Sequence, residues 1–565
     1  MLSEKVENAI ESISDLFRSG YTPICASSFG KDSSVMTALA LEALRRVVSE
    51  GIAVQPMWVA TMDTMVENPL VHNYAITSLA EVAKFAEEQN LPVKTYVGTP
   101  ATTNMYLVNM FGGRVFASMP NQSSACSDMM KISTVRRMKK TLLMASGGDP
   151  DRIVSLIGKR FDESEARAAN MAKRGERADR PVRNEQGDWI MSPIANFTIE
   201  DIFEFIGDVR NDRFKTYSDF EDLVNIYRSA TGDCMVTAYI TGRSSSTSCG
   251  SRTGCWICLR GAEDHSMQNM LEETENQFMK GLNDLRNYIA YYHDHPKARN
   301  WLARTVNEDG TITIGAGAYS PQFCKELLRY SLTLDAIERE AAADLGIEPR
   351  FQTLRPEDVV AISLLHARYG YAEPLMACKE WHEIHHLGKR YPIPELPPGP
   401  RPSLPKFSPM RVQLEDDEFG KLFQGLRDVW LATIDHEPVI EKKGHAFYAI
   451  NTGEEFSVDR EASALYLEYG MGLEEDLANI RDGAPAADAF FMLTRKGMIT
   501  FHKGSHSTQD AMLRLSNAIH RKGLRDVLND PIALVERLGG PVDSLDPGRP
   551  DDSIGGRVQI HLPLF

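Results

Sequence analysis

A short polar segment between an apolar run and a helix-like stretch limits the fold of this chain most. Residues 28–33 read Ser-Phe-Gly-Lys-Asp-Ser, after the apolar run 22–26 and before the apolar stretch 35–41. This order predicts a strand, a tight turn and the start of a helix, whose free N–H groups and dipole attract an anion. The glycine allows close backbone approach, and the serines and lysine add donors and charge. An ordinary strand-to-helix turn is the alternative.

Strands and helices alternate through the first two hundred residues. Apolar runs at 52–60, 93–97 and 153–158 follow the first one, and a helix-like stretch covers 70–88. Strands separated by helices predict a parallel sheet with helices on both faces. Ligands bind at the carboxyl ends of such strands. Polar residues fall at those ends, namely Thr61 and Asp63 after the second run and residues 159–164 after the fourth.

Several segments, in order, resemble one family. The segment 28–33 resembles the Ser-Gly-Gly-x-Asp-Ser loop of the PP-loop ATP pyrophosphatases, the adenine-nucleotide α-hydrolase family, rather than the Walker P-loop. Phe29 replaces the first family glycine, so we expect no positive φ there. Further segments are similar to phosphoadenylyl-sulfate reductases and to the DNA phosphorothioation proteins DndC and SspD. They are 63–69, 126–131 (Cys-Thr-x-x-x-Lys in the family), 157–167 (Gly-x-Arg-x-x-Glu-Ser-x-x-Arg) and 192–202 (Pro-Ile-x-x-Trp-Ser/Thr-x-x-Asp-Val).

The resemblance implies an α/β adenine-nucleotide α-hydrolase-like fold, ATP as substrate and Mg²⁺ as its partner ion. The charged side chains of Lys131, Arg160 and Arg167 can bind phosphate oxygens. We expect Glu163 to brace the two arginines. The expected catalytic residues are Lys31, Asp32, Ser33, Lys131 and Arg160. The expected nucleotide-binding residues are Ser28, Phe29, Gly30, Lys31, Asp32, Ser33, Thr61, Asp63 and Arg167.

Four of the eight cysteines are closely spaced. Cys234, Cys249, Cys255 and Cys258 lie among glycines, and in a reducing compartment such a set predicts a metal site rather than disulfides. Spacing alone leaves a structural zinc and a 4Fe–4S cluster open. DndC-like proteins carry an iron–sulfur site after the PP-loop domain, so the resemblance favours the cluster. We expect Cys25, Cys324 and Cys378 in the core, whereas Cys126 either packs or transfers sulfur.

The overall charge of −16 argues against general coating of nucleic acid. Residues 131–183, however, contain 14 Lys and Arg against 7 Asp and Glu. This excess predicts either an anion-binding face or a solvated helix surface. The polar, acidic first residues and the lack of a long apolar run predict a cytoplasmic protein without membrane association.

The later half is less informative. His382–His386 matches His-Glu-x-x-His, but glycine and prolines follow, so we expect a helix end rather than a zinc protease. We expect strands at 446–450 and 489–493, and a short helix from Asp459. The predicted domains are a PP-loop domain at 1–230, an iron–sulfur segment at 231–265, a mainly helical region at 266–391, a Pro-rich linker at 392–409 and a C-terminal α+β domain at 410–565.

The sequence therefore predicts an ATP pyrophosphatase that acts in DNA phosphorothioation. Its expected partners are ATP, DNA, a cysteine desulfurase as sulfur donor, and other phosphorothioation proteins. Two alternatives remain, namely a sulfonucleotide reductase and a non-catalytic nucleotide-binding scaffold subunit. The reductase is expected to carry a cysteine nucleophile near its C-terminus, which residues 560–565 do not supply.

Overall fold

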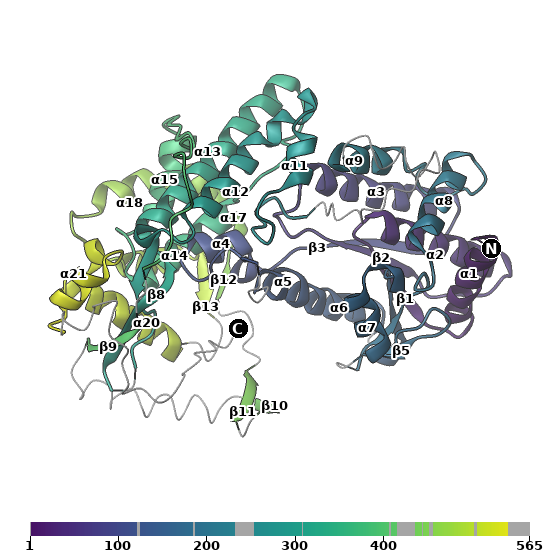
Figure 1. Ribbon diagram of the computed structural model, residues 1–565, viewed down its shortest axis with the longest axis horizontal. Coiled ribbons are helices and arrows are strands. Elements are labelled where there is room, and N and C mark those ends of the chain that lie inside the picture. Colours follow the sequence, from purple (N-terminus) through teal and green to yellow (C-terminus); the bar gives the residue numbers. More distant parts are fainter. Residues whose placement is uncertain are drawn as a thin grey trace. The chain divides into compact units, whose positions relative to one another are not determined.

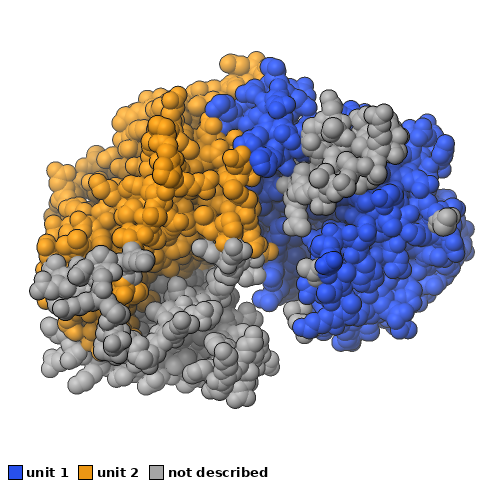
Figure 2. Space-filling view, viewed as in Figure 1, with its two compact units in different colours: residues 1–100, 130–256, 264–280 blue, residues 101–129, 257–263, 281–565 orange. Residues whose placement is uncertain are grey.

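The computed structural model contains two compact units, coloured separately in Figure 2. Unit 1 comprises residues 1–100, 130–256 and 264–280, and unit 2 comprises residues 101–129, 257–263 and 281–565. The structure describes residues 2–120, 125–147, 149–184, 187–231, 254–307, 309–405, 408–414, 436–442, 445–450, 456–501 and 506–540.

Unit 1 is built on a six-stranded sheet in the order β3-β2-β1-β4-β6-β5. Pairing is parallel between all neighbours except β5 and β6, which confirms the predicted mainly parallel sheet. β2 begins later than predicted, after Pro56, which has no N–H to donate to a ladder. The strands are β1 (Thr22–Ala26), β2 (Met57–Met62), β3 (Val93–Gly98), β4 (Ile153–Ile157), β5 (Val182–Arg183) and β6 (Trp189–Met191).

Helices cover both faces of this sheet (Figure 1). Alternate strand residues point to opposite faces, so Cys25 and Val59 join one buried cluster while Ile24 and Ala60 join another. The larger cluster contains residues of α1 (Leu2–Arg18), α2 (Lys31–Ser49), α3 (Pro69–Glu88), α8 (Ile199–Arg210) and α9 (Glu221–Thr231). The smaller contains Met138 and Leu142 of α6 (Ser133–Ala145). Unit 1 also contains α7 (Glu165–Lys173) and α11 (His265–Met270).

Local signals start several of these helices where the sequence predicts. The Asn68 side chain accepts a hydrogen bond from Leu70 N and caps α3, with proline at its first position. Thr198 and Asp201 form a reciprocal capping box at the start of α8.

The strand order places a topological switch next to β1. From β1 the chain continues through β2 to β3 on one side, and β4 pairs with the other side of β1. Loops leave the carboxyl ends of β1 and β4 in diverging directions at such a point, which opens a crevice for a ligand. The segment 28–33 and the residues after β4 both begin there.

Unit 2 combines helices with small antiparallel sheets. β7, β8 and β9 form a three-stranded antiparallel sheet, which the helical pattern of residues 266–391 did not predict. Its helices in that region are α12 (Lys280–Tyr292), α13 (Pro321–Leu345), α14 (Pro356–Tyr369) and α15 (Met376–His385). The remaining elements include α4 (Tyr106–Phe111), β7 (Arg299–Leu302), β8 (Thr311–Tyr319), β9 (Met410–Gln413), β10 (His436–Lys442), β11 (His445–Ile450), β12 (Phe456–Val458), α17 (Arg460–Leu467), α18 (Leu473–Asn479), α19 (Asp488–Arg495), β13 (Ile499–Phe501), α20 (His506–Arg521) and α21 (Pro531–Arg537).

Two of three local predictions in the later part are confirmed. β11 coincides with the strand predicted at 446–450, and Asp459 caps α17 by accepting from Ala462 N. The strand predicted at 489–493 is wrong, because these residues belong to α19. Ala489 and Leu493, four apart, are both buried while Phe491 is 46% exposed, which is helical periodicity. Among the described helices, none has the length and apolar character needed to cross a bilayer.

Candidate functional site

The loop from β1 to α2 closes tightly and leaves the helix start open. Phe29 has φ of 51°, so the expectation of a negative φ at this position is wrong. The buried Phe29 ring packs edge-on against Tyr217, with ring centroids 6.1 Å apart. Gly30 is the N-cap of α2 and, as a glycine, supplies no side-chain cap. The first turn of α2 therefore presents its positive end as an anion site.

Hydroxyl groups hold the loop in shape. The Ser28 and Ser33 Oγ atoms are 3.2 Å apart, and Ser33 Oγ donates to the Gly30 carbonyl at 3.1 Å. Lys31 N lies 3.4 Å from the Tyr227 hydroxyl, and Lys31 Nζ lies 5.2 Å from the centre of the same ring. Ser28 is exposed and Ser33 is buried.

An ion pair joins this loop to the carboxyl end of β4. Arg160 Nε donates to Asp32 Oδ1 at 2.6 Å, and the Arg160 side chain is only 3% exposed. Arg160 Nη1 also donates to Asp162 Oδ2 at 3.2 Å, and that carboxylate accepts from Ile199 N at the start of α8. A buried pair of this kind fixes the loop relative to two neighbouring elements.

Gly158 lies directly against the loop. A Cβ atom at this position would be 2.8 Å from Ser33 Cα and 3.0 Å from Ser33 N. Both are backbone atoms, so a side chain here displaces the loop.

The Asp32 carboxylate contacts two cationic side chains. Its Oδ1 binds Arg160, and its Oδ2 lies 3.7 Å from Lys31 Nζ. Both oxygens thus face cationic groups, and a metal ion would have to displace one of them. The arrangement instead makes Asp32 a brace for Arg160 and Lys31.

A second polar group lies at the carboxyl end of β2. Ligand atoms of Asp63, Glu67 and His72 all lie within 4.8 Å of one another, and Asp63 Oδ1 is 3.5 Å from His72 Nδ1. Asp63 Oδ1 also accepts from Met65 N at 2.8 Å. Burial, and then the neighbouring Asp63 carboxylate, raise the pKa of Glu67 to about 7.

The other predicted site residues lie apart from the loop contacts. Thr61 is buried in β2. Lys131 is exposed, and its positive charge opposes the rise in the pKa of Glu67. Arg167 is 48% exposed and pairs with Glu163, its neighbour one turn away, as the bracing role predicts.

The cysteines divide into core and candidate ligand groups. Cys25, Cys324 and Cys378 are buried as predicted, and burial raises the pKa of each thiol. Cys234 and Cys249 lie outside the described residues. Cys255 pairs through its backbone with Glu67 in an isolated β-bridge, and Trp256 N donates to Val66 O at 2.9 Å.

In unit 2, two cysteines lie close to one tyrosine. Burial is the main cause that raises the pKa of the Tyr106 hydroxyl, and a hydrogen bond with Ser118 opposes this rise. The charges of Cys126 and Cys258 raise the same pKa further. The buried Arg286 donates to the carbonyls of Cys258 and Gly261, at 3.2 and 2.5 Å. This guanidinium stiffens the turn that follows Cys258. No local sequence pattern predicts the contact between Arg286 and this turn.

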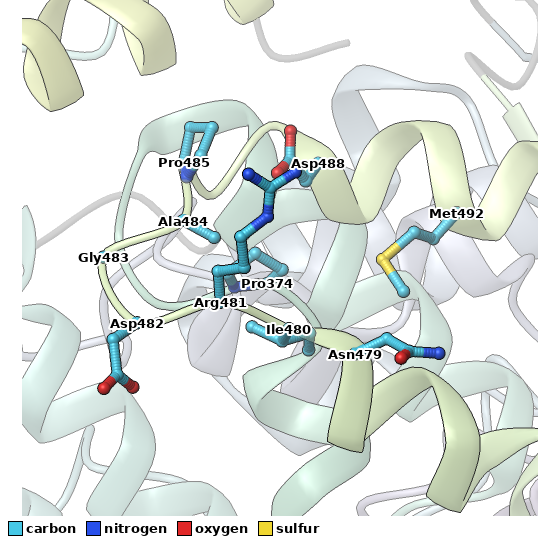
Figure 3. Close-up of a pocket in the computed structure, with 10 residues that line it drawn as sticks. All are labelled: Pro374, Asn479, Ile480, Arg481, Asp482, Gly483, Ala484, Pro485, Asp488 and Met492. Carbon is cyan, nitrogen blue, oxygen red and sulfur yellow. The ribbon is translucent and has the colours of Figure 1, made fainter.

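The His-Glu-x-x-His segment and a cavity in unit 2 do not contribute to the candidate site. Glu383 of the His-Glu-x-x-His segment pairs with Tyr391 and Lys389 near the end of α15, so it is not free to act as a base. A cavity of about 400 Å³ in unit 2 is lined by Arg481, Asp488 and neighbours from the loop after α18 (Figure 3). None of the predicted site residues lines it.

The structure adds residues to the candidate site that sequence reasoning missed. Gly158 and Asp162 belong to a recognised segment, so that segment could have indicated them. Glu67 lies in the segment 63–69 but carries no signal of its own, and Tyr227 and His72 carry none at all.

Comparison with known proteins agrees with this geometry. Residues 22–215 match the family model described as the phosphoadenosine phosphosulfate reductase domain. A search of curated proteins gives no match. The matched range begins at β1 and ends after α8, so it contains the whole six-stranded sheet and the loop after β1. Together these findings support a nucleotide-binding domain of the phosphoadenosine phosphosulfate reductase-like PP-loop family in the N-terminal part of this chain.

Proposed function

We propose that this domain is an ATP pyrophosphatase, which cleaves ATP to AMP and pyrophosphate. The observation that carries the proposal is the N-terminus of α2, which its N-cap glycine leaves without a side-chain cap and which the Arg160–Asp32 pair and the close approach of Gly158 hold at the switch point. Backbone N–H groups and a helix dipole at this position match the negative charge of a pyrophosphate.

The proposed reaction is an in-line displacement at the α-phosphorus of ATP. An acceptor oxygen forms a bond to that phosphorus, the bond to the bridging oxygen breaks, and pyrophosphate leaves with the electron pair. Lys31 and the hydroxyls of Ser28 and Ser33 bind the leaving oxygens, and Arg160 positions the loop through Asp32. With water as the acceptor, the products are AMP and pyrophosphate.

The proposed acceptor is a phosphate oxygen of the DNA backbone. Pyrophosphate release leaves that oxygen adenylated. The outer sulfur of a cysteine desulfurase persulfide then attacks the DNA phosphorus, and AMP departs with the oxygen. A second thiol breaks the S–S bond of the persulfide, so that sulfur stays on the DNA and the two thiols leave as a disulfide. The support is the similarity of residues 63–69, 126–131, 157–167 and 192–202 to DndC-type proteins, together with the basic surface of α6.

The products of ATP cleavage test the pyrophosphatase proposal. Purified protein with MgATP should release AMP and pyrophosphate, measured by ion-exchange chromatography. Asp32→Ala and Ser33→Ala should each remove most of this activity, because they release Arg160 and open the loop. Asp15→Ala and Ser49→Ala, which change exposed residues of the same types, serve as matched controls and should stay active. Release of ADP and phosphate would overturn the proposal.

The family match makes sulfonucleotide reduction an equally compatible second candidate. A reductase transfers two electrons from a dithiol to phosphoadenylyl sulfate and releases sulfite and adenosine 3′,5′-bisphosphate. Incubating the protein with that substrate and reduced thioredoxin distinguishes the two enzymes by sulfite release. A scaffold subunit would bind ATP and turn over neither substrate.

We further propose that Cys234, Cys249, Cys255 and Cys258 hold a 4Fe–4S cluster. The described part fits such a site, because Cys258 is exposed on a turn stiffened by Arg286, beside the buried Trp256 and Ile257. A bound cluster would supply a one-electron redox centre. Protein purified without oxygen should be brown and contain iron and acid-labile sulfide in roughly equal amounts. Colourless protein with stoichiometric zinc and no sulfide would establish the structural-zinc alternative instead.

A further inference from the structure

We propose that Asp63, Glu67 and His72 form a binding site for a divalent transition-metal ion. The site lies at the carboxyl end of β2 and the start of α3, and it differs from both the loop 28–33 and the four-cysteine segment. The proposal does not depend on the proposed nucleotide chemistry.

The geometry of the three side chains fits one ion. Two ligand atoms that each lie ~2.1 Å from a single ion can be at most about 4.2 Å apart. Asp63 Oδ1 and His72 Nδ1, at 3.5 Å, are already within this limit, and all three ligand atoms lie within 4.8 Å of one another. A small rotation of a partly exposed side chain therefore completes the set. The hydrogen bond from Met65 N holds the Asp63 carboxylate in position.

A buried hydroxyl also lies beside these ligands. Thr64 is 1% exposed, and its Oγ1 makes no hydrogen bond that meets normal geometry with any described residue. The same side chain lies beside the Glu67 carboxylate, where it favours the charged form. A water bound to an ion at this site would give this hydroxyl a partner with better geometry.

The donor set indicates the class of ion. Two carboxylate oxygens and one imidazole nitrogen suit Mn²⁺, Fe²⁺ or Zn²⁺ better than Mg²⁺, which prefers oxygen ligands alone. Three protein ligands leave coordination positions open for water or another ligand.

Charge balance at the site favours a cation. Two positive groups oppose the binding of a cation. They are the exposed Lys131, with one positive charge, and the N-terminus of α3, with about half a positive charge. An ion binds the deprotonated forms of Asp63 and Glu67, whose two negative charges then exceed this opposition. Because Lys131 acts against the ion, its removal should tighten ion binding, a result that a purely structural role of the three ligands does not predict.

Binding of Mn²⁺ to the full-length protein tests the site. Free Mn²⁺ gives a six-line electron paramagnetic resonance signal that is lost on binding, and this ion binds thiolates poorly, which limits interference from the cysteines. The titration uses metal-stripped protein without nucleotide. We expect one bound Mn²⁺ per chain, at least about tenfold weaker binding in each of Asp63→Asn, Glu67→Gln and His72→Gln, and tighter binding in Lys131→Ala.

Two control proteins separate this site from other acidic or thiol groups. Glu87→Gln/Glu88→Gln removes two exposed carboxylates at the far end of α3 and should leave Mn²⁺ affinity unchanged. Cys255→Ser/Cys258→Ser should retain the ion. Circular dichroism checks that every variant is folded. Dissociation constants above ~1 mM in the parent protein, or unchanged affinity in the three ligand variants, would each overturn the proposal.

Discussion

At the scale of single residues, the loop after β1 shows how a strained position is stabilised by burial. A non-glycine residue with left-handed φ costs roughly 1–3 kcal/mol. Phe29 is 1% exposed, and burying a side chain of this size contributes about 1.5–3 kcal/mol, with a further ~1 kcal/mol from the edge-on contact with Tyr217. The burial therefore offsets the strain, and phenylalanine occupies a position where the related loops carry glycine.

Gly158→Ala should damage catalysis more than stability. The new Cβ would be 2.8 Å from Ser33 Cα, so the loop must move by several tenths of an ångström. Misplacing positioning groups by ~1 Å costs about 10²-fold, so this smaller shift should lower kcat/KM by about tenfold or more. The measurement is pyrophosphate release from ATP together with thermal unfolding.

Gly207→Ala in α8 is the matched control for this change. No atom lies within 4 Å of the added Cβ, and alanine is a better helix former than glycine by about 1 kcal/mol. This variant should be fully active and slightly more stable. Equal activity in the two variants would show that the contact between Gly158 and the loop has no catalytic importance.

At the scale of elements, α6 carries one group of the exposed basic residues within the range 131–183. Several basic residues of this range pair with acidic ones, as in Lys139–Asp188, Arg174–Glu176 and Arg183–Asp151. On α6, Met138 and Leu142 face the sheet. Arg136, Arg137 and Lys140 are exposed. The helix thus combines an apolar inner face with a basic outer face.

Arg136→Glu/Arg137→Glu should weaken DNA binding much more than ATP cleavage. Phosphate contacts release counterions, so binding of the parent protein should weaken with salt and the variant should show a shallower salt dependence. The measurement is fluorescence anisotropy of labelled duplex DNA across a salt series. Lys84→Glu/Lys215→Glu makes the same change in charge at exposed sites away from α6 and is the control. Equal losses in both variants would leave only overall charge as the cause.

At the scale of the whole molecule, unit 2 buries an ionisable side chain that links its stability to pH. His366 is 2% exposed, and its Nε2 donates to the Phe111 carbonyl at 2.8 Å. Its Nδ1 has no hydrogen-bond partner among the described residues, so protonation there would bury an uncompensated charge. Burial lowers the pKa of His366 to about 4.

This lowered pKa predicts a loss of stability in mild acid. Between the folded pKa near 4 and the ordinary value of about 6.5, the unfolded chain binds a proton that the folded chain does not, so stability falls as pH falls through this range. Near pH 5 the loss amounts to about 2 kcal/mol. His366→Gln removes the titrating group.

The stability difference between the parent protein and His366→Gln should therefore shrink by about this amount between pH 7.5 and pH 5, measured by urea unfolding. Subtracting the variant from the parent at each pH cancels the contributions of the other titrating groups. A difference that stays constant with pH would contradict the assigned pKa.

The sequence by itself determined several elements of unit 1 and the strand, turn and helix order around residues 28–33. Apolar runs identified β1, β3 and β4, and a helix-like stretch identified α3, because each pattern lies within one local segment. The N-cap residue Asp459 could be predicted from the sequence for the same reason. The turn at residues 28–33 could be predicted because small and polar residues such as Gly30 and Ser33 interact with backbone atoms close by in the sequence.

Only the tertiary structure decided which distant residues meet. The Arg160–Asp32 pair and the contact of Gly158 with Ser33 exist because β4 lies beside β1, and no local pattern encodes that strand order. The proximity of Asp63, Glu67 and His72 likewise depends on the turn between β2 and α3, where Met65 adopts a positive φ. Local interactions specify elements over a few residues, whereas a site requires the packing of the whole sheet.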